Sequence, residues 1–318
     1  MATSGSINFT QTRNELIQDA LALIGVYVIG RTISGEDMAF SANMFNKMVK
    51  SYQTQGLHLW AKEEAYLFIA DNTAEYTLSS DSSSARATLR SDAVITELSA
   101  AEAASQTTIS VDSSSGMATS DIVGIVADDD TMHWSTISSI PGSTSIVIAD
   151  ATAAASAAGN NVYTFTSRIN KPLRILSMRR VTGGPDSPSS VPMVALSHEE
   201  YFDLPNKELN GPPTHYYYNP DLTTGKVYLW PRPDDPEMYF EFTYERMLED
   251  FDAAGDNADF PSEWLECLTY NLAVRLAPAF GKSNMLQILI PMAQELTNQV
   301  LYFDQEITSV SFQPNLRY

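Results

Sequence analysis

The sequence has little sulfur, little positive charge and no long uninterrupted apolar run, and each shortage excludes a class of protein. Cys267 is the single cysteine among 318 residues, so an internal disulfide and a cysteine-based zinc cluster are excluded. The most apolar early run, residues 16–29, contains Gln18 and Asp19 and is too short to span a bilayer. Residues 1–12 carry no basic residue and no apolar block, unlike a secretory signal. We therefore expect a soluble protein of a reducing compartment, with no membrane partner.

Positive charge is scarce, with 19 Lys plus Arg against 39 Asp plus Glu and a formal net charge of −20. Affinity for nucleic acid comes mostly from cations that replace counterions on phosphate, so this balance argues against a protein that grips DNA. An acidic wall can instead line a passage through which DNA slides without adhering, because like charges repel. A hydrophobic content of 44% argues against disorder, and the length suits two domains or one domain with an insertion.

The N-terminal end carries the pattern of two amphipathic helices. Thr12 and Glu15 have the spacing of a capping box, and the apolar face that follows ends near Gly25. Ser34 begins a second pattern, in which apolar residues recur at steps of three and four until a stop at Gly56.

The C-terminal end carries a second pair of helical patterns. Pro261 suits the first turn of a helix, where its missing N–H costs nothing, and a leucine stripe follows until Gly281. Ser283 is expected to cap the last helix, whose apolar stripe reaches Phe303 at alternating steps of three and four. Pro291 lies off that stripe, which predicts a kink rather than an end.

Between the helical ends the pattern changes to short strands. Serine, threonine, alanine and aspartate dominate residues 80–166, where short apolar runs alternate with polar turns. Within them, the three aspartates at 128–130 are read as a hairpin turn. Ten prolines between 185 and 236 punctuate the region 172–247, so the strands of that region are expected to be short or to lie at sheet edges. Aromatic clusters at 216–218 and 239–244 have acidic rather than basic companions, which favours strand core and subunit interface over base stacking.

These patterns predict an α+β fold, in which both chain ends form one discontinuous helical-bundle domain around a central β region with an inserted small all-β module. The expected parts, in chain order, are the N-terminal part of the helical domain (1–60), β strands (61–79), the inserted all-β module (80–166), a β-rich region (167–248), the C-terminal part of the helical domain (249–306) and an extended C-terminal tail (307–318).

No pattern of catalytic or metal-binding residues stands out, and we expect neither a cofactor nor a metal. The histidines lack ligand-like spacing: His58, His133, His198 and His215. Adjacent acids could in principle supply the carboxylate pair of a glycosidase, but such neighbours arise by chance among 39 acidic residues. These neighbours are Glu199-Glu200, Asp234-Asp235 and Glu249-Asp250. Cys267 lies beside the leucine stripe and is read as a core thiol.

Three segments, taken in order, carry a more specific pattern. Residues 259–281 contain Pro-x-x-Trp followed by Leu-Ala-x-x-Leu-Ala-Pro-x-Phe-Gly. Residues 216–233 lead from three tyrosines into Tyr-Leu-Trp-Pro-Arg-Pro, and residues 123–135 turn from Val-Gly-Ile-Val through aspartates into His-Trp-Ser. Together with the paired N-terminal helices, they resemble the head-to-tail adaptor of short-tailed bacteriophages, the tail tubular protein A or packaged-DNA stabilisation protein family. That family usually has tyrosine where Phe280 stands here. The motif residues of the helix are Pro261, Trp264, Leu272, Arg275, Pro278 and Gly281.

The resemblance implies a structural virion protein rather than an enzyme. Family members form a homo-oligomeric ring, usually of twelve subunits, that docks beneath the portal protein after packaging. The ring extends the channel, retains packaged double-stranded DNA without sequence-specific binding, and offers a platform to a downstream tail or nozzle protein. The implied place is the virion neck, between capsid and tail, with the host cytoplasm during assembly.

The resemblance also implies a role for residues 307–318, because the C-terminal tail of such proteins reaches along the portal. The implied portal-binding residues are Phe312, Pro314, Leu316, Arg317 and Tyr318. A segment without helical pattern would become ordered on binding, which suits assembly triggered by a completed partner. The alternative function is a cell-wall-degrading virion enzyme, since such activity is attributed to some relatives. A further alternative, a DNA-binding protein, requires salt-sensitive retention of duplex DNA.

Overall fold

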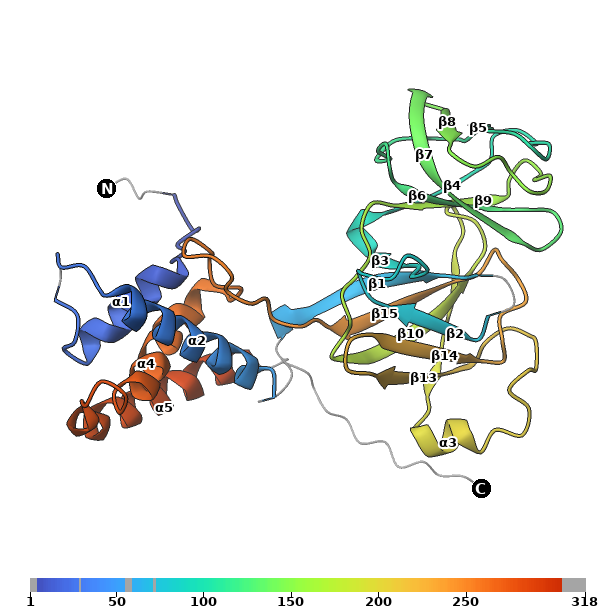
Figure 1. Cartoon of the computed structure of the whole chain (residues 1–318). Helices are drawn as coiled ribbons and strands as arrows, with labels where there is room; N and C mark the ends of the chain where they lie inside the picture. The colour runs from blue at the N-terminus through green and yellow to red at the C-terminus, as the bar shows by residue number, and fades with distance from the viewer. Residues whose placement is uncertain (1–4, 29, 55–58, 71–72, 305–318) are drawn as a thin grey trace. The chain divides into compact units, whose positions relative to one another are not determined.

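The computed structural model describes residues 5–28, 30–54, 59–70 and 73–304. The chain has a mixed α+β fold, which confirms the expected class. It divides into two compact units (Figure 1). We call Met1–Ala61 with Leu248–Tyr318 the helical unit, and Lys62–Met247 the β unit.

The helical unit is built around α4, which packs against α1, α2 and α5. The helices are α1 (Arg13–Leu23), α2 (Gly35–Tyr52), α4 (Leu265–Leu276) and α5 (Leu286–Phe303), with 3-10 turns η1 (Leu59–Ala61), η3 (Ser262–Trp264) and η4 (Ser283–Met285). One hydrophobic cluster contains side chains from all four helices, among them Leu21, Phe45, Leu272 and Leu289. The two ends of the chain therefore share one core.

Local capping begins the N-terminal helices where the sequence predicts. The backbone N–H of Thr12 donates to Glu15 Oε2 at 2.8 Å, and the backbone N–H of Glu15 donates to Thr12 Oγ1 at 3.4 Å, so the capping box is confirmed. Ser34 Oγ accepts from the backbone N–H of Asp37 at 3.1 Å at the start of α2. The predicted stop at Gly56 lies outside the described residues.

Three details of the C-terminal helices differ from the prediction. Pro261 precedes η3 at its N-cap instead of occupying the first helical turn. Ser283 does not cap α5, because η4 runs directly into the helix and places Ser283 inside that turn. Phe303 is 78% exposed, because a stripe that steps by three and four drifts around a helix of 3.6 residues per turn. Pro291 lies inside α5, which continues past it.

The β unit contains two antiparallel-dominated sheets whose side chains share one hydrophobic cluster. The first sheet has the order β11-β10-β15-β1-β3, and the second has the order β12-β13-β14-β2. The strands are β1 (Lys62–Phe68), β2 (Glu75–Leu78), β3 (Ala87–Leu89), β10 (Arg174–Thr182), β11 (Ser189–Pro192), β12 (Val194–Ala195), β13 (His215–Pro220), β14 (Gly225–Trp230) and β15 (Tyr239–Glu245). The short helix α3 (His198–Phe202) contacts β13, and the turn η2 (Arg90–Asp92) follows β3.

The expectation that proline restricts all strands of this region to sheet edges or short lengths is wrong for β10 and β15. Both strands are interior to the first sheet, with nine and seven residues. The prolines fall almost entirely in the connections, where no ladder hydrogen bond is lost. Those within strands are Pro192, on the edge strand β11, and Pro220, at the end of β13.

The third sheet has the order β4-β9-β6-β7-β8-β5. Its strands are β4 (Ala93–Glu97), β5 (Thr108–Ser110), β6 (Ile122–Val126), β7 (Met132–Gly142), β8 (Ser145–Ile148) and β9 (Asn161–Phe165). An antiparallel bridge between Leu98 and Val111 joins the ends of β4 and β5, with a hydrogen bond of 3.1 Å from Ser99 N to Ser110 O beside it. The sheet therefore closes into a small barrel, which removes its free edges.

The barrel, residues 93–165, has its own apolar interior, which includes Ile109, Val123, Ile146 and Val162. Asp128–Asp130 form the exposed turn between β6 and β7, as predicted. The module expected at 80–166 also takes in β3, which pairs with β1 of the first sheet. The barrel itself begins at Ala93.

Candidate interaction surfaces

The motif residues of α4 lie in the core of the helical unit and at the ends of the helix. Leu272 is fully buried, and Trp264 is 2% exposed. The Trp264 ring lies 5.7 Å from the ring of Tyr52 and 5.6 Å from the ring of Phe260. This motif therefore anchors the N-terminal end of α4 to α2 through aromatic contacts.

The remaining motif residues fix the other end of α4. Arg275 Nη2 donates to Ser51 Oγ on α2 at 3.0 Å. Pro278 is exposed just after the helix. Gly281 has φ +70°, and the N–H of Lys282 returns to the carbonyl of Ala277 at 2.8 Å. A glycine meets that backbone conformation without the strain that a side chain would add, which explains the helix end.

A polar seam joins α4 to α5 beside the single cysteine. Asn271 Nδ2 donates to Thr297 Oγ1 at 2.9 Å and to the Cys267 carbonyl at 2.9 Å, and Thr297 Oγ1 donates to the Ala293 carbonyl at 2.7 Å. Cys267 is fully buried, and burial raises the pKa of its thiol. The environment disfavours the thiolate, so this cysteine has the character of a core side chain.

An apolar cleft of about 440 Å³ lies beside Trp264, between the start of α4 and the end of α5. Its lining includes Leu59, Trp60, Val300 and Phe303. The motif residues Pro261 and Trp264 form part of its wall. Concave apolar surface of this kind suits an apolar side chain of a partner.

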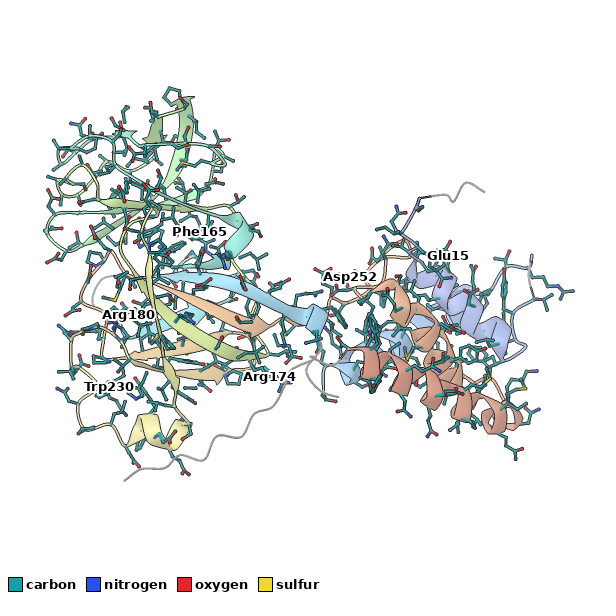
Figure 2. The ribbon with its side chains drawn as sticks, turned by 180° about the vertical axis from the view of Figure 1, so that it is seen from behind. Glu15, Phe165, Arg174, Arg180, Trp230 and Asp252 are labelled. Carbon is teal, nitrogen blue, oxygen red and sulfur yellow. The ribbon has the colours of Figure 1, made fainter. Side chains whose placement is uncertain are left out.

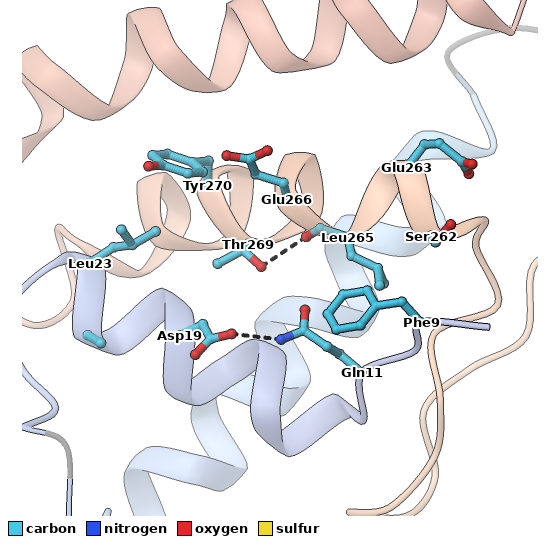
Figure 3. Close-up of a pocket in the computed structure, with 11 residues that line it drawn as sticks. Phe9, Gln11, Asp19, Leu23, Ser262, Glu263, Leu265, Glu266, Thr269 and Tyr270 are labelled. Carbon is cyan, nitrogen blue, oxygen red and sulfur yellow. Dashed lines mark hydrogen bonds between the residues drawn. The ribbon is translucent and has the colours of Figure 1, made fainter. Parts of the chain in front are cut away.

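A second depression of about 690 Å³ lies between α1 and α4 (Figure 3). Phe9, from the segment before α1, lies beside Leu265, and Gln11 Nε2 donates to Asp19 Oδ2 at 2.9 Å. Glu263 and Glu266 bring further negative charge to the lining. The groove therefore combines an apolar floor with an acidic rim.

From Arg86 onward, the arginines and lysines of the β unit are held by contacts within that unit. Arg90 Nη1 lies 2.8 Å from both Glu64 Oε2 and Glu241 Oε1. Arg174 and Arg180 both lie on β10 (Figure 2). Arg174 donates to the buried carboxylate of Glu245, and Arg180 donates to the Pro213 carbonyl. Backbone, aromatic or carboxylate contacts likewise hold Arg86, Arg168, Lys171, Arg179, Lys207, Lys226, Arg232 and Arg246.

The barrel has an excess of negative charge, because residues 93–165 contain aspartate and glutamate but neither lysine nor arginine. From Arg86 onward, the cations of the β unit already have partners within it, and the barrel contributes no lysine or arginine. Little positive charge therefore remains to bind phosphate. The described part of the β unit is therefore poorly suited to electrostatic binding of DNA.

Two of the adjacent acids named from the sequence make local contacts in the structure. Glu200 accepts a hydrogen bond from the backbone N–H of Ser197 at 2.7 Å, and this bond lowers the pKa of its carboxyl. Asp250 pairs with Lys50 at 2.7 Å. A glycosidase acid requires a raised pKa on one partner. At Glu200 the shift runs the other way.

Glu237 has a raised carboxyl pKa, and the sequence pattern did not single it out. Burial is the largest cause, and the nearby charges of Asp235 and Glu97 add to it. Glu97 ends β4 of the barrel, while Glu237 precedes β15 of the first sheet. Their proximity depends on tertiary structure, so no sequence spacing could reveal it.

Each described histidine has a ring nitrogen within hydrogen-bond distance of a backbone carbonyl or a hydroxyl group. His133 Nε2 lies 3.2 Å from the Asp150 carbonyl, His198 Nδ1 lies 3.1 Å from Tyr217 Oη, and His215 Nδ1 lies 2.8 Å from Thr214 Oγ1. His58 lies outside the described residues. Over the ranges that the structure describes, no group of three or more His, Cys, Asp or Glu side chains could hold a metal ion.

The residues expected to bind the portal all lie outside the described part of the chain: Phe312, Pro314, Leu316, Arg317 and Tyr318. Among the described helices, none is both long enough and apolar enough to cross a membrane.

A family model described as SU10 adaptor protein matches residues 142–309, more than half of the chain. The match includes the motif helix α4 and all of α5, and it ends before Phe312. No curated protein matches the sequence.

Proposed function

The chain belongs to the SU10 adaptor protein family, a family of phage structural adaptors, and we propose that it forms the ring-shaped head-to-tail adaptor of its virion. The ring, of about twelve copies, docks under the portal protein, extends the DNA channel, retains packaged DNA and carries the downstream tail or nozzle protein. The observation that carries this proposal is the family match across α4 and α5. We place the protein in the virion neck, with the host cytoplasm as the place of assembly.

In this proposal the helical unit is the discontinuous bundle domain of the ring, and the barrel is an inserted module. The more specific kinship with tail tubular protein A rests on the motif residues Pro261, Trp264 and Gly281, with the order of the three resembling segments. The charge pattern supports a channel role. The arginines of the β unit are engaged in internal contacts, and the charged side chains of the barrel include acids but no lysine or arginine. Such a surface would let DNA pass without adhering.

We further propose that residues 307–318 bind the portal. The apolar side chains Phe312, Leu316 and Tyr318 would anchor the segment, with Arg317 as its cation. The segment begins four residues after Phe303, the last residue of α5. An anchor at the end of a short connecting segment can reach a partner without rearrangement of the helical unit.

The test compares docking of three proteins to portal-bearing heads: the full chain, a chain ending at residue 306, and a triple variant Phe312→Ala, Leu316→Ala and Tyr318→Ala. The matched control is Thr308→Ala with Ser309→Ala and Ser311→Ala, which changes three polar residues of the same segment. We expect the full chain and the control to dock, and the other two to fail while keeping the circular dichroism of the full chain.

Equal docking of the shortened chain would show that the C-terminal segment is not the portal contact. Failure of the full chain to dock on heads that hold the portal would contradict the adaptor function itself.

A further inference from the structure

The outer face of α5 carries large apolar side chains although nothing in the chain's described structure covers them. Glu295 is the single charged residue of this 18-residue helix. On the outer face, Ile288 is 59% exposed, Met292 43% and Tyr302 79%. About 100° further around the helix, Leu289 is buried in the core of the helical unit. Large apolar side chains that stay exposed beside a buried face are typical of a helix that a partner also covers.

These outer residues form one stripe. Successive members of the stripe are four, three, four and three residues apart: Ile288, Met292, Glu295, Gln299 and Tyr302. At 100° per residue, this spacing keeps them on one narrow face of the helix. Glu295 is at its centre, with an exposed apolar residue seven positions before it and another seven positions after it. Its carboxylate makes no ion pair within the ranges that the structure describes.

The outer face of α2 carries the complementary pattern. Phe40 is 42% exposed, and Lys47, seven residues later, is also exposed. Asn43 lies between them on the same face. The Lys47 ammonium group has no ion-pair partner in the described part of the chain. On the inner side of α2, Phe45 and Met48 are fully buried.

We propose that the outer face of α2 in one copy packs on the outer face of α5 in the next copy. With Lys47 opposite Glu295, Phe40 meets Ile288 if the helices run parallel and Tyr302 if they run antiparallel. In both cases the two contacts are two helical turns apart, about 10.5 Å on each helix. Opposite charges then meet at the centre, and exposed apolar side chains meet beside them.

The charge of the chain favours a second copy as the occupant. With a net charge of −20, two copies repel each other over most of their surfaces. They approach at lowest cost where one face is nearly uncharged and the other brings a cation. Because the two faces differ, the contact is heterologous, and repeated copies form a ring when the rotation closes. Because it assumes that copies assemble into a ring, this inference rests on the proposed function.

Cysteine cross-linking tests the contact directly. One preparation carries Asn43→Cys on α2, and others carry Met292→Cys or Gln299→Cys on α5; all three positions are exposed. The native Cys267 is buried. We mix an α2 variant with an α5 variant in the presence of portal-bearing heads, add copper phenanthroline as oxidant, and count copies in the cross-linked product. Electron microscopy of the same samples reports whether a ring has formed.

We expect a disulfide-linked dimer only when an α2 variant meets an α5 variant, and a ladder of higher products when both cysteines are on one chain. Glu266→Cys, an exposed position on α4, replaces the α5 cysteine in the control and should give no dimer. Preference for Met292→Cys indicates parallel helices, and preference for Gln299→Cys indicates antiparallel ones. Dimers from an α5 variant alone would overturn the proposal in favour of a symmetric contact.

Charge reversal provides a second test on the same contact. Lys47→Glu or Glu295→Lys alone should weaken assembly at low salt by about fivefold per contact, and the double variant should regain it. A ring that forms normally without the α2–α5 cross-link overturns this inference and leaves the adaptor function intact. Absence of any ring on portal-bearing heads overturns both.

Discussion

The side-chain amide of Asn46 holds the backbone of Phe251 by two hydrogen bonds. Asn46 Nδ2 donates to the Phe251 carbonyl at 3.2 Å, and the Phe251 N–H donates to Asn46 Oδ1 at 3.0 Å, across 205 residues of sequence. The Phe251 ring lies 4.5 Å from the ring of Phe45 on α2. The segment in which the chain re-enters the helical unit is thereby fastened to α2.

Replacing Asn46 should destabilise the helical unit. Asn46→Ala removes both hydrogen bonds and leaves two backbone groups of Phe251 without a protein partner, so we expect the free energy of unfolding to fall by about 1–3 kcal/mol. Asn43→Ala, on the exposed face of α2, is the control and should change it by less than about 0.5 kcal/mol. In a background with Trp134→Phe and Trp230→Phe, fluorescence of Trp60 and Trp264 during denaturation reports this unit. Equal stability of the two variants would contradict the role of the amide.

Local signals explain which elements the sequence predicts well. The capping box of Thr12 and Glu15 needs residues three apart, and the leucine stripe of α4 needs one helical face. Both are visible without knowledge of tertiary structure. The short strands of the barrel are likewise bounded by turn residues, as at Asp128–Asp130.

Long-range contacts explain what the sequence does not predict. The closure of the barrel rests on Leu98 and Val111, and the fastening of α2 rests on Asn46 and Phe251; neither pair has a local signature. The interior position of β15 depends on partners far away in sequence. The sequence of α5 alone does not show which of its apolar residues are exposed, because that depends on which of them α4 buries.

The tyrosines of the β unit should make it sensitive to alkali. Burial raises the pKa of Tyr239 to about 12, and burial with a hydrogen bond to Glu63 raises the pKa of Tyr244. The folded state favours the protonated phenols. Their contribution to the free energy of unfolding is therefore complete below pH 10 and is lost as pH rises from 10 toward 12 and beyond. We expect phenolate absorbance and loss of β circular dichroism to rise together in that range.

Tyr244→Phe separates this effect from general alkaline damage. The variant lacks one phenol with a raised pKa, so its stability should fall less steeply above pH 10 than that of the parent chain. A steeper or equal slope would show that Tyr244 does not contribute to the pH dependence.

The polar seam between α4 and α5 should control access to Cys267. Thr297→Val removes the hydroxyl that accepts from Asn271, and we expect a loss of about 1 kcal/mol in stability and labelling of the thiol about fivefold faster. Asn298→Ala, the exposed neighbour on α5, is the control. Labelling with a thiol reagent that changes absorbance measures the rate. Rapid labelling of the parent chain would contradict the burial of this cysteine.

Duplex DNA should not be retained by the isolated chain. With Arg86 and the later cations of the β unit held in internal contacts and a barrel without lysine or arginine, we expect no mobility shift of linear duplex at about 50 mM salt, where electrostatic binding is strong. A basic protein of similar size is the positive control. A shift that disappears as salt is raised would show that cations are available to phosphate after all.

The most direct measurement of the central claim is cryo-electron microscopy of portal-bearing phage heads incubated with the purified chain. The adaptor function predicts a closed ring of copies, coaxial with the portal and absent from heads that lack the chain. Heads that stay bare at the portal, or copies bound elsewhere on the capsid, would contradict it.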